Sequence, residues 1–145
     1  MPTHAEQRVL PYSPKQMFDL VAEIDRYDEF LPWCVGARIK ERKENIVLAD
    51  LVIGFWMFRE RFGSRVTFLP ARCRIETEYI DGPFKHMRSN WEFEDVERGC
   101  EVRFDVDFEF KSRLLQGAAG LFFQDAMTRI VRAFEARARE LYGDA

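Results

Sequence analysis

Hydrophobic and polar residues alternate along most of the middle of this chain, a pattern typical of strands with one buried face. The clearest case is residues 101–110, where Val and Phe alternate with charged residues. Turn signals such as Asp81-Gly82-Pro83 separate these stretches. The pattern predicts an antiparallel sheet with one wet face and one dry face. Its strands are expected at residues 3–10, 37–43, 46–53, 55–68 with a bend at Gly63, 73–79, 87–94 and 101–110.

The first helix is expected directly after the first strand and has a well-marked start. Ser13 and Gln16 form a capping box, and Pro14 stands at the first helical position, where its missing N–H is not needed. Asp25 is then expected to cap a short second helix. Pro32 should end that helix, because proline cannot continue it.

A long amphipathic helix is predicted at the end of the chain, over about residues 121–142. This helix should lie on the dry face of the sheet. The order of strand, two helices, six strands and helix predicts an α+β helix-grip fold, in which a curved antiparallel sheet wraps around the C-terminal helix. Such a fold encloses either a core or a cavity. The apolar stripe of the helix consists of Phe123, Met127, Ile130, Val131, Phe134, Ala138 and Leu141.

Length and composition indicate one globular domain over residues 1–145, large enough to bury a single core. Hydrophobic residues make up 47% of the chain and charged residues 32%, which argues against disorder. The net charge of -3 argues against a broad nucleic-acid footprint and against DNA as a partner. A net charge of this size still allows a local basic patch on the surface.

The chain shows no secretory signal and no apolar run of the ~20 residues that a membrane span needs. We therefore expect a soluble, cytoplasmic protein, with peripheral contact at the inner membrane as a further option. Cys34, Cys73 and Cys100 are an odd number of widely spaced cysteines. They fit reduced intracellular thiols better than a disulfide framework.

The connector at residues 25–34 carries Tyr27, Phe30, Leu31 and Trp33, where an ordinary connector would be polar. Connectors with this much apolar surface usually cover something. This one is expected to close one end of the sheet or the mouth of a cavity, which makes a ligand the first question.

The connector is one of several motifs that run in order through nearly the whole chain. They are residues 21–34, Gly82-Pro83-Phe84, Trp91-x-Phe93, residues 108–112 and residues 133–138. On these motifs the chain resembles the coenzyme Q-binding START-like family of the polyketide cyclase/dehydrase superfamily, which also includes the bacterial ribosome-association toxin. The scaffold of this superfamily hosts several functions.

The resemblance implies a non-catalytic binder of a polyprenyl quinone, most plainly ubiquinone, that supports respiratory electron transport. Ubiquinone would be a bound ligand, and no cofactor is expected. The toxin's name implies an alternative, a ribosome-binding inhibitor of subunit association with the large subunit as partner. A cyclase or aromatase on the same scaffold ranks third.

A quinone carrier needs a long apolar slot with one or two polar groups for the oxygens of the head group. The dry faces of the strands and of the last helix can supply it, and the connector can supply the mouth. The alternative interpretation is that the same residues fill a core and close the fold. The candidate lining is Phe30, Trp33, Trp91, Phe93, Phe104, Phe108, Met127, Val131 and Phe134.

The stretch before the last helix combines two glycines with bulky apolar residues. Glycine weakens the local backbone, so this stretch can serve as a mobile gate that contacts a membrane and passes a lipid. The alternative is a loop and first helical turn packed on the sheet. The gate residues are Leu114, Leu115, Gly117, Gly120, Leu121 and Phe122.

Catalysis finds little support in the sequence, which contains no familiar catalytic or metal-binding motif. His4 lies near a terminus and His86 on an outer strand face, so both are expected to be solvated. Glu60 and Asp50 are the carboxylates that could face inward. Cys34 is expected to fill space, because no neighbouring base is evident.

Basic residues gather on the predicted strands, and their usual role is to solvate a strand face. They could also bind anionic lipid head groups or ribosomal RNA, and either interaction would weaken steeply with salt. One group is Arg38, Lys40, Arg42 and Lys43, and the other is Arg59, Arg61, Arg65, Arg72 and Arg74.

Overall fold

The computed structural model describes residues 3–55 and 58–143, and it confirms the predicted α+β helix-grip fold. In this part of the chain, seven strands form one curved antiparallel sheet in the order β1-β7-β6-β5-β4-β3-β2. The strands are β1 (Thr3–Leu10), β2 (Cys34–Lys43), β3 (Ile46–Phe55), β4 (Phe58–Leu69), β5 (Arg74–Asp81), β6 (Phe84–Val96) and β7 (Gly99–Phe110).

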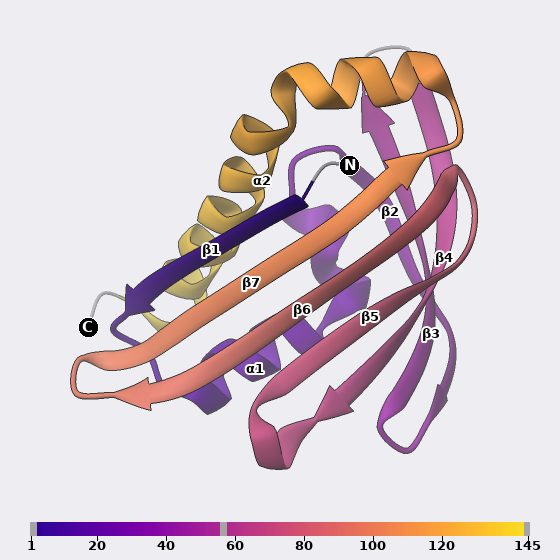
Figure 1. Ribbon diagram of the computed structural model, residues 1–145. Helices are drawn as coiled ribbons and strands as arrows, with labels where there is room; N and C mark the ends of the chain where they lie inside the picture. Colours follow the sequence, from indigo (N-terminus) through magenta and orange to yellow (C-terminus); the bar gives the residue numbers. More distant parts are fainter. Residues whose placement is uncertain (1–2, 56–57, 144–145) are drawn as a thin grey trace.

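The helices connect and cover these strands. They are α1 (Pro14–Ala22), the 3-10 helices η1 (Ile24–Glu29) and η2 (Pro70–Arg72), and α2 (Arg113–Tyr142). Figure 1 shows that the first part of α2 crosses one end of the sheet and that its second part runs back behind β1 and β7. The concave face of the sheet and the helices therefore enclose the interior.

The start of α1 is as predicted. The Ser13 hydroxyl accepts a hydrogen bond from the Gln16 backbone N–H at 3.0 Å, and the Gln16 side chain accepts one from the Ser13 N–H at 2.9 Å. Pro14 occupies the first helical position. Met17, Leu20 and Val21 bury the inner face of this helix against the sheet.

Two predictions about helices are wrong. Asp25 does not cap the second helix, because η1 is a 3-10 helix that begins at Ile24 after a Glu23 cap. The last helix begins at Arg113 and not near Leu121. Its early start is held by Gln116, whose Oε1 accepts a hydrogen bond from the Phe110 N–H at 2.8 Å. Glycine lowers helix propensity by only about 1 kcal/mol, and such tertiary contacts override it.

The strand predictions hold in type and order and are too short at several ends. Phe55 ends β3, so the predicted strand 55–68 corresponds to β4 from Phe58 onward. Its expected bend is present as a shift in the β4–β5 register between Gly63 and Ser64. Cys73 precedes β5 in a left-handed conformation that ends η2.

Candidate functional site

A cavity of about 640 Å³ lies between the concave face of the sheet, η1 and α2. This volume falls within the range of sites for small molecules, roughly 300–1,000 Å³. The strands contribute Leu51, Ile53, Glu60, Phe62, Ser64, Val66, Ile75, Thr77, Phe84, Met87, Ser89, Trp91, Phe104, Val106, Phe108 and Phe110. The helices and the connector contribute Ile24, Tyr27, Leu31, Pro32, Trp33, Asp125, Ala126, Met127, Arg129, Ile130 and Phe134.

The structure brings most of the predicted lining residues together. Those that line the cavity are Trp33, Trp91, Phe104, Phe108, Met127 and Phe134. Trp91 is the centre of this wall, with its ring 4.4 Å from Phe104 and 4.9 Å from Phe134 between centroids. The alternation of apolar and polar residues predicted that Trp91 and Phe104 point to the same face of the sheet. The β6–β7 register places these two residues directly opposite each other.

Three predicted lining residues are not among the described residues that line the cavity. Phe93 is 4% exposed and packs edge-on to Phe18, deeper in the core. Val131 is 5% exposed and belongs to the same core. Phe30 lies behind the lining, edge-on to Phe134 at 5.3 Å.

We infer that the cavity opens beside Asp125 and Arg129 of α2, because these two lining residues are exposed. Asp125 and Arg129 stand there with side chains 68% and 62% exposed and form an ion pair of 3.1 Å. Trp33 lies in the connector with a left-handed backbone, at a φ of 65°. A bulky residue rarely adopts this conformation, and such strain is found mostly at functional positions. The connector contributes Tyr27, Leu31, Pro32 and Trp33 to the lining and so forms one lip of the cavity.

A clasp joins this lip to α2. The Arg137 guanidinium donates to Glu29 at 2.7 Å and lies 5.1 Å from the centroid of the Phe30 ring. The Tyr27 hydroxyl donates to the Val21 carbonyl oxygen, and its burial raises the pKa of Tyr27. These contacts fix η1 between α1 and α2.

Three hydroxyl-bearing residues line the cavity on adjacent strands: Ser64 on β4, Thr77 on β5 and Ser89 on β6. None of these three residues was predicted from the sequence as a site residue. Their positions in the strands were the available signal. Thr77 points to the same face as Ile75, two residues away, and Ser89 to the same face as Trp91.

The two carboxylates named as inward candidates separate in the structure. Glu60 is part of the cavity lining. Asp50 lies outside that lining, although it is only 8% exposed. Its carboxylate accepts from Arg61 at 2.6 Å and stands 3.7 Å from Arg38, so it anchors part of the basic cluster.

The expectation that His4 is solvated is wrong. His4 is 9% exposed, because β1 pairs with β7 along its whole length, and its Nε2 lies 2.9 Å from Glu6. Burial opposes ionisation of Glu6, but hydrogen bonds with Arg8 and His4 prevail and lower its pKa. His86 is partly exposed, with its Nε2 3.4 Å from Asp107.

The three cysteines are free thiols. Burial raises the pKa of Cys34 and raises that of Cys100 to about 11, so neither thiol is activated as a nucleophile. Within residues 3–55 and 58–143, no group of three or more His, Cys, Asp or Glu residues could hold a metal ion.

The predicted gate residues all lie on α2. Leu114 is 69% exposed, and Gly117 has open space around it. The side chains of Leu115, Leu121 and Phe122, and the surroundings of Gly120, lie outside the described part of the structure. The gate remains a prediction, now placed on a helix and not in a loop.

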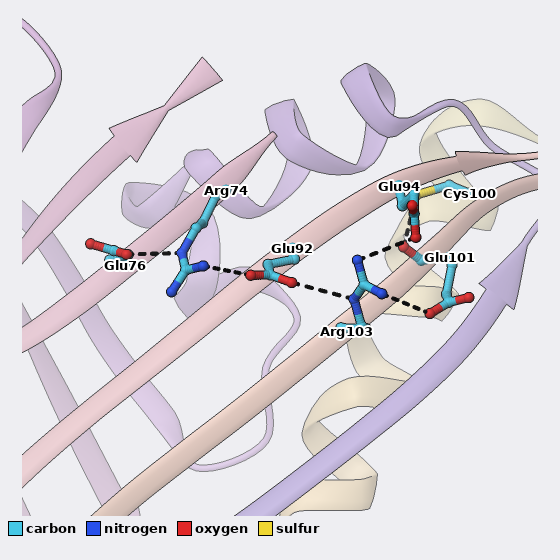
Figure 2. A network of polar contacts seen from close by, with 7 residues as sticks. All are labelled: Arg74, Glu76, Glu92, Glu94, Cys100, Glu101 and Arg103. Atoms are coloured by element: carbon cyan, nitrogen blue, oxygen red, sulfur yellow. Dashed lines mark hydrogen bonds and ion pairs between the residues drawn. The ribbon is translucent and has the colours of Figure 1, made fainter. Parts of the chain in front are cut away.

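The convex face carries a network of charges. Figure 2 shows Arg74 between Glu76 and Glu92, with Arg103 continuing the row from Glu92 towards Glu94 and Glu101. Arg65 likewise pairs with Glu78 at 2.7 Å. Three arginines of the predicted basic group on residues 59–74 form ion pairs with carboxylates. They are Arg61, Arg65 and Arg74.

The basic residues of β2 differ from the arginines of residues 59–74 in their ion pairing. Lys40, Arg42 and Lys43 are exposed on β2, and no ion pair holds them within the described residues. Because β2 is an edge strand, these three cations face solvent at one side of the sheet.

In the part of the chain that the structure covers, no helix combines the length and apolar content needed to cross a membrane.

Comparisons with known proteins agree with this architecture. Residues 10–135 match the family model described as polyketide cyclase / dehydrase and lipid transport. The ribosome association toxin RatA of Rickettsia prowazekii is 37% identical over 137 residues, covering 92% of this chain and 94% of the toxin. The mitochondrial coenzyme Q-binding protein COQ10 homolog B of Xenopus laevis is 34% identical over 145 residues.

The match to the frog protein covers 97% of this chain and 59% of that longer relative. Among solved structures, an aromatase/cyclase from Streptomyces superposes with a TM-score of 0.86 over 99% of both chains. Its 13% sequence identity shows a shared fold and nothing finer.

Proposed function

The chain belongs to the polyketide cyclase/dehydrase and lipid transport family, and on that premise we propose that it binds a polyprenyl quinone, such as ubiquinone, in its cavity. In this proposal the protein carries or shields the quinone and performs no chemistry on it. The frog relative, whose printed name is coenzyme Q-binding protein, supports this choice of ligand.

The observation that carries the proposal is the composition of the cavity wall. Aromatic and aliphatic side chains dominate a space of about 640 Å³, and a few hydroxyls interrupt them. This is the pattern of a site for an apolar molecule that bears a small number of oxygen atoms. The head group and the first part of a tail fit a space of this size, and a longer tail would leave through the opening beside Asp125 and Arg129.

Extraction of the purified protein with organic solvent, followed by mass spectrometry, tests the proposal. The protein should be produced in a bacterium that makes ubiquinone. We expect ubiquinone in the extract in an amount comparable to that of the protein. A different lipid, or no lipid even after incubation with quinone-loaded vesicles, would contradict the assignment.

A second candidate function is binding to the large ribosomal subunit, and it has its own support. The Rickettsia relative is named a ribosome association toxin, and β2 of this chain presents exposed cations, without an ion pair to any described residue, that could meet phosphate groups. These two observations do not involve the cavity, so the two functions can be tested separately.

Reversing two of these charges, Lys40→Glu with Arg42→Glu, is expected to reduce co-sedimentation with large subunits at least tenfold. Neutralising phosphates releases counterions, so binding of the unaltered protein should also fall as salt rises. Sedimentation through sucrose at several salt concentrations measures both effects. Lys111→Glu with Arg132→Glu makes the same charge change elsewhere on exposed residues and is the control. Equal losses in both variants would show that net charge, and not β2, matters.

A further inference from the structure

The hydroxyl groups that line the cavity stand in one row across three neighbouring strands, and this arrangement indicates where the ligand's oxygen atoms lie. Thr77 on β5 pairs directly with Ser89 on β6. Ser64 on β4 pairs with Tyr79, which stands two residues from Thr77 on the same face. Directly paired side chains lie about 5 Å apart, and diagonal neighbours about 7–8 Å apart. The three hydroxyls therefore form one short band across three strands.

The band interrupts inward positions that are otherwise apolar. On β4 the neighbours of Ser64 in the same phase are Phe62 and Val66, and on β6 those of Ser89 are Met87 and Trp91. Ser64 is only 2% exposed. Alanine or valine would fit the apolar pattern, so the hydroxyls need a separate explanation.

The hydroxyls also have no partner to satisfy them within the described residues. None of Ser64, Thr77 and Ser89 has a side-chain hydrogen bond there, although all three border the cavity. Placing a hydroxyl in an apolar site costs free energy unless something bonds to it. A row of such groups facing one space therefore indicates that the occupant of the space supplies the missing bonds.

We propose that Ser64, Thr77 and Ser89 form the subsite for the oxygen-bearing ring of the ligand; this rests on the proposed function. A hydroxyl can donate and accept a hydrogen bond. The band can therefore donate to the carbonyl oxygens of a quinone and accept from the hydroxyls of the corresponding quinol. The site takes both redox forms with similar affinity, as a carrier without redox chemistry requires.

The position of Glu60 sets the direction of the ligand. Glu60 precedes Ser64 by four residues on the same face of β4, a distance of about 13 Å along an extended strand. A carboxylate suits the wet end of a cavity, and the hydroxyls suit the enclosed end. The ring therefore lies against the band, and the tail runs past Glu60 towards the opening beside Asp125 and Arg129.

The test uses the full chain with three substitutions together, Ser64→Ala, Thr77→Val and Ser89→Ala. Three probes are titrated: 2,3-dimethoxy-5-methyl-6-decyl-1,4-benzoquinone, its quinol, and decylbenzene, which has a ring and tail but no oxygen. We expect the variant to bind the quinone and the quinol at least tenfold more weakly, and decylbenzene within threefold of the unaltered protein. The thermal midpoint should stay equal or rise, because the removed hydroxyls have no hydrogen-bond partner among the described residues.

Thr67→Val is the matched control, because Thr67 is a hydroxyl on β4 in the opposite phase, paired with Glu76. It should change none of the three affinities. Unchanged quinone binding in the triple variant would overturn the subsite and leave the proposed function standing. Loss of the quinone alone, with the quinol unaffected, would overturn the claim of redox tolerance. Failure of the unaltered protein to bind either form would remove the proposed function itself.

Discussion

Replacement of Ala126 by tryptophan is expected to abolish quinone retention while leaving the fold intact. Ala126 lines the cavity from α2, between the opening and the aromatic wall, and its side chain is the smallest of the helical lining. A large ring there would occupy space that the ligand needs. Overpacking a filled core typically costs 1–3 kcal/mol. Because a cavity accepts the new ring, we expect a loss of no more than about 1 kcal/mol in the free energy of unfolding.

Ligand retention is measured by solvent extraction and mass spectrometry, and stability by urea denaturation. Arg132→Trp introduces the same ring on the exposed side of α2 and should retain the quinone. If the Ala126 variant kept its quinone, the ligand would have to lie outside this cavity. Val131 is less informative as a site for such a substitution, because it is buried in the core outside the lining.

Replacement of Phe134 by alanine should produce the largest loss of stability, about 3–5 kcal/mol. Phe134 is 3% exposed, and its ring packs edge-on against Tyr27 at 5.4 Å, Phe30 at 5.3 Å and Trp91 at 4.9 Å. It therefore holds the lip, the last helix and the sheet together. Its removal takes one ring contact from each of these three residues and enlarges the cavity.

Urea denaturation followed by circular dichroism measures this loss. Phe134→Leu should show an intermediate loss, because leucine keeps part of the apolar volume. Leu141→Ala removes a comparable apolar group from the same helix at a position 47% exposed, and it should change stability by less than about 1 kcal/mol. A Phe134→Ala variant within 1 kcal/mol of the unaltered protein would mean that these ring contacts contribute little.

The sequence was most informative where a short local pattern determines the structure, such as the two-residue alternation of a strand or a capping motif. Alternation along residues 101–110 is enough to place Phe104 and Phe108 inward, because neighbouring side chains of a strand point to opposite faces. The capping box fixes the start of α1 for a similarly local reason. The order of the elements follows from the same local patterns, and the structure confirms it.

What the sequence could not supply depends on contacts between distant segments. An apolar stripe on α2 does not tell which of its residues face the sheet and which face a cavity, so Met127 and Val131 looked equivalent. The start of α2 depends on a hydrogen bond from the Phe110 backbone, which no local propensity encodes. The hydroxyl band becomes visible only when the register aligns three strands.

The sheet topology has a consequence for how the chain is synthesised. Strands β2 to β6 each pair with the next strand in sequence, so these hairpins can form while the chain emerges. β1 emerges before these strands but pairs with β7, so Thr3 cannot pair until Asp107 has been made. The 30 residues of α2, which cover the dry face, follow β7. The nascent chain therefore exposes its most apolar surface until α2 has been made, and a product truncated before Arg113 would be an early substrate for chaperones and proteases.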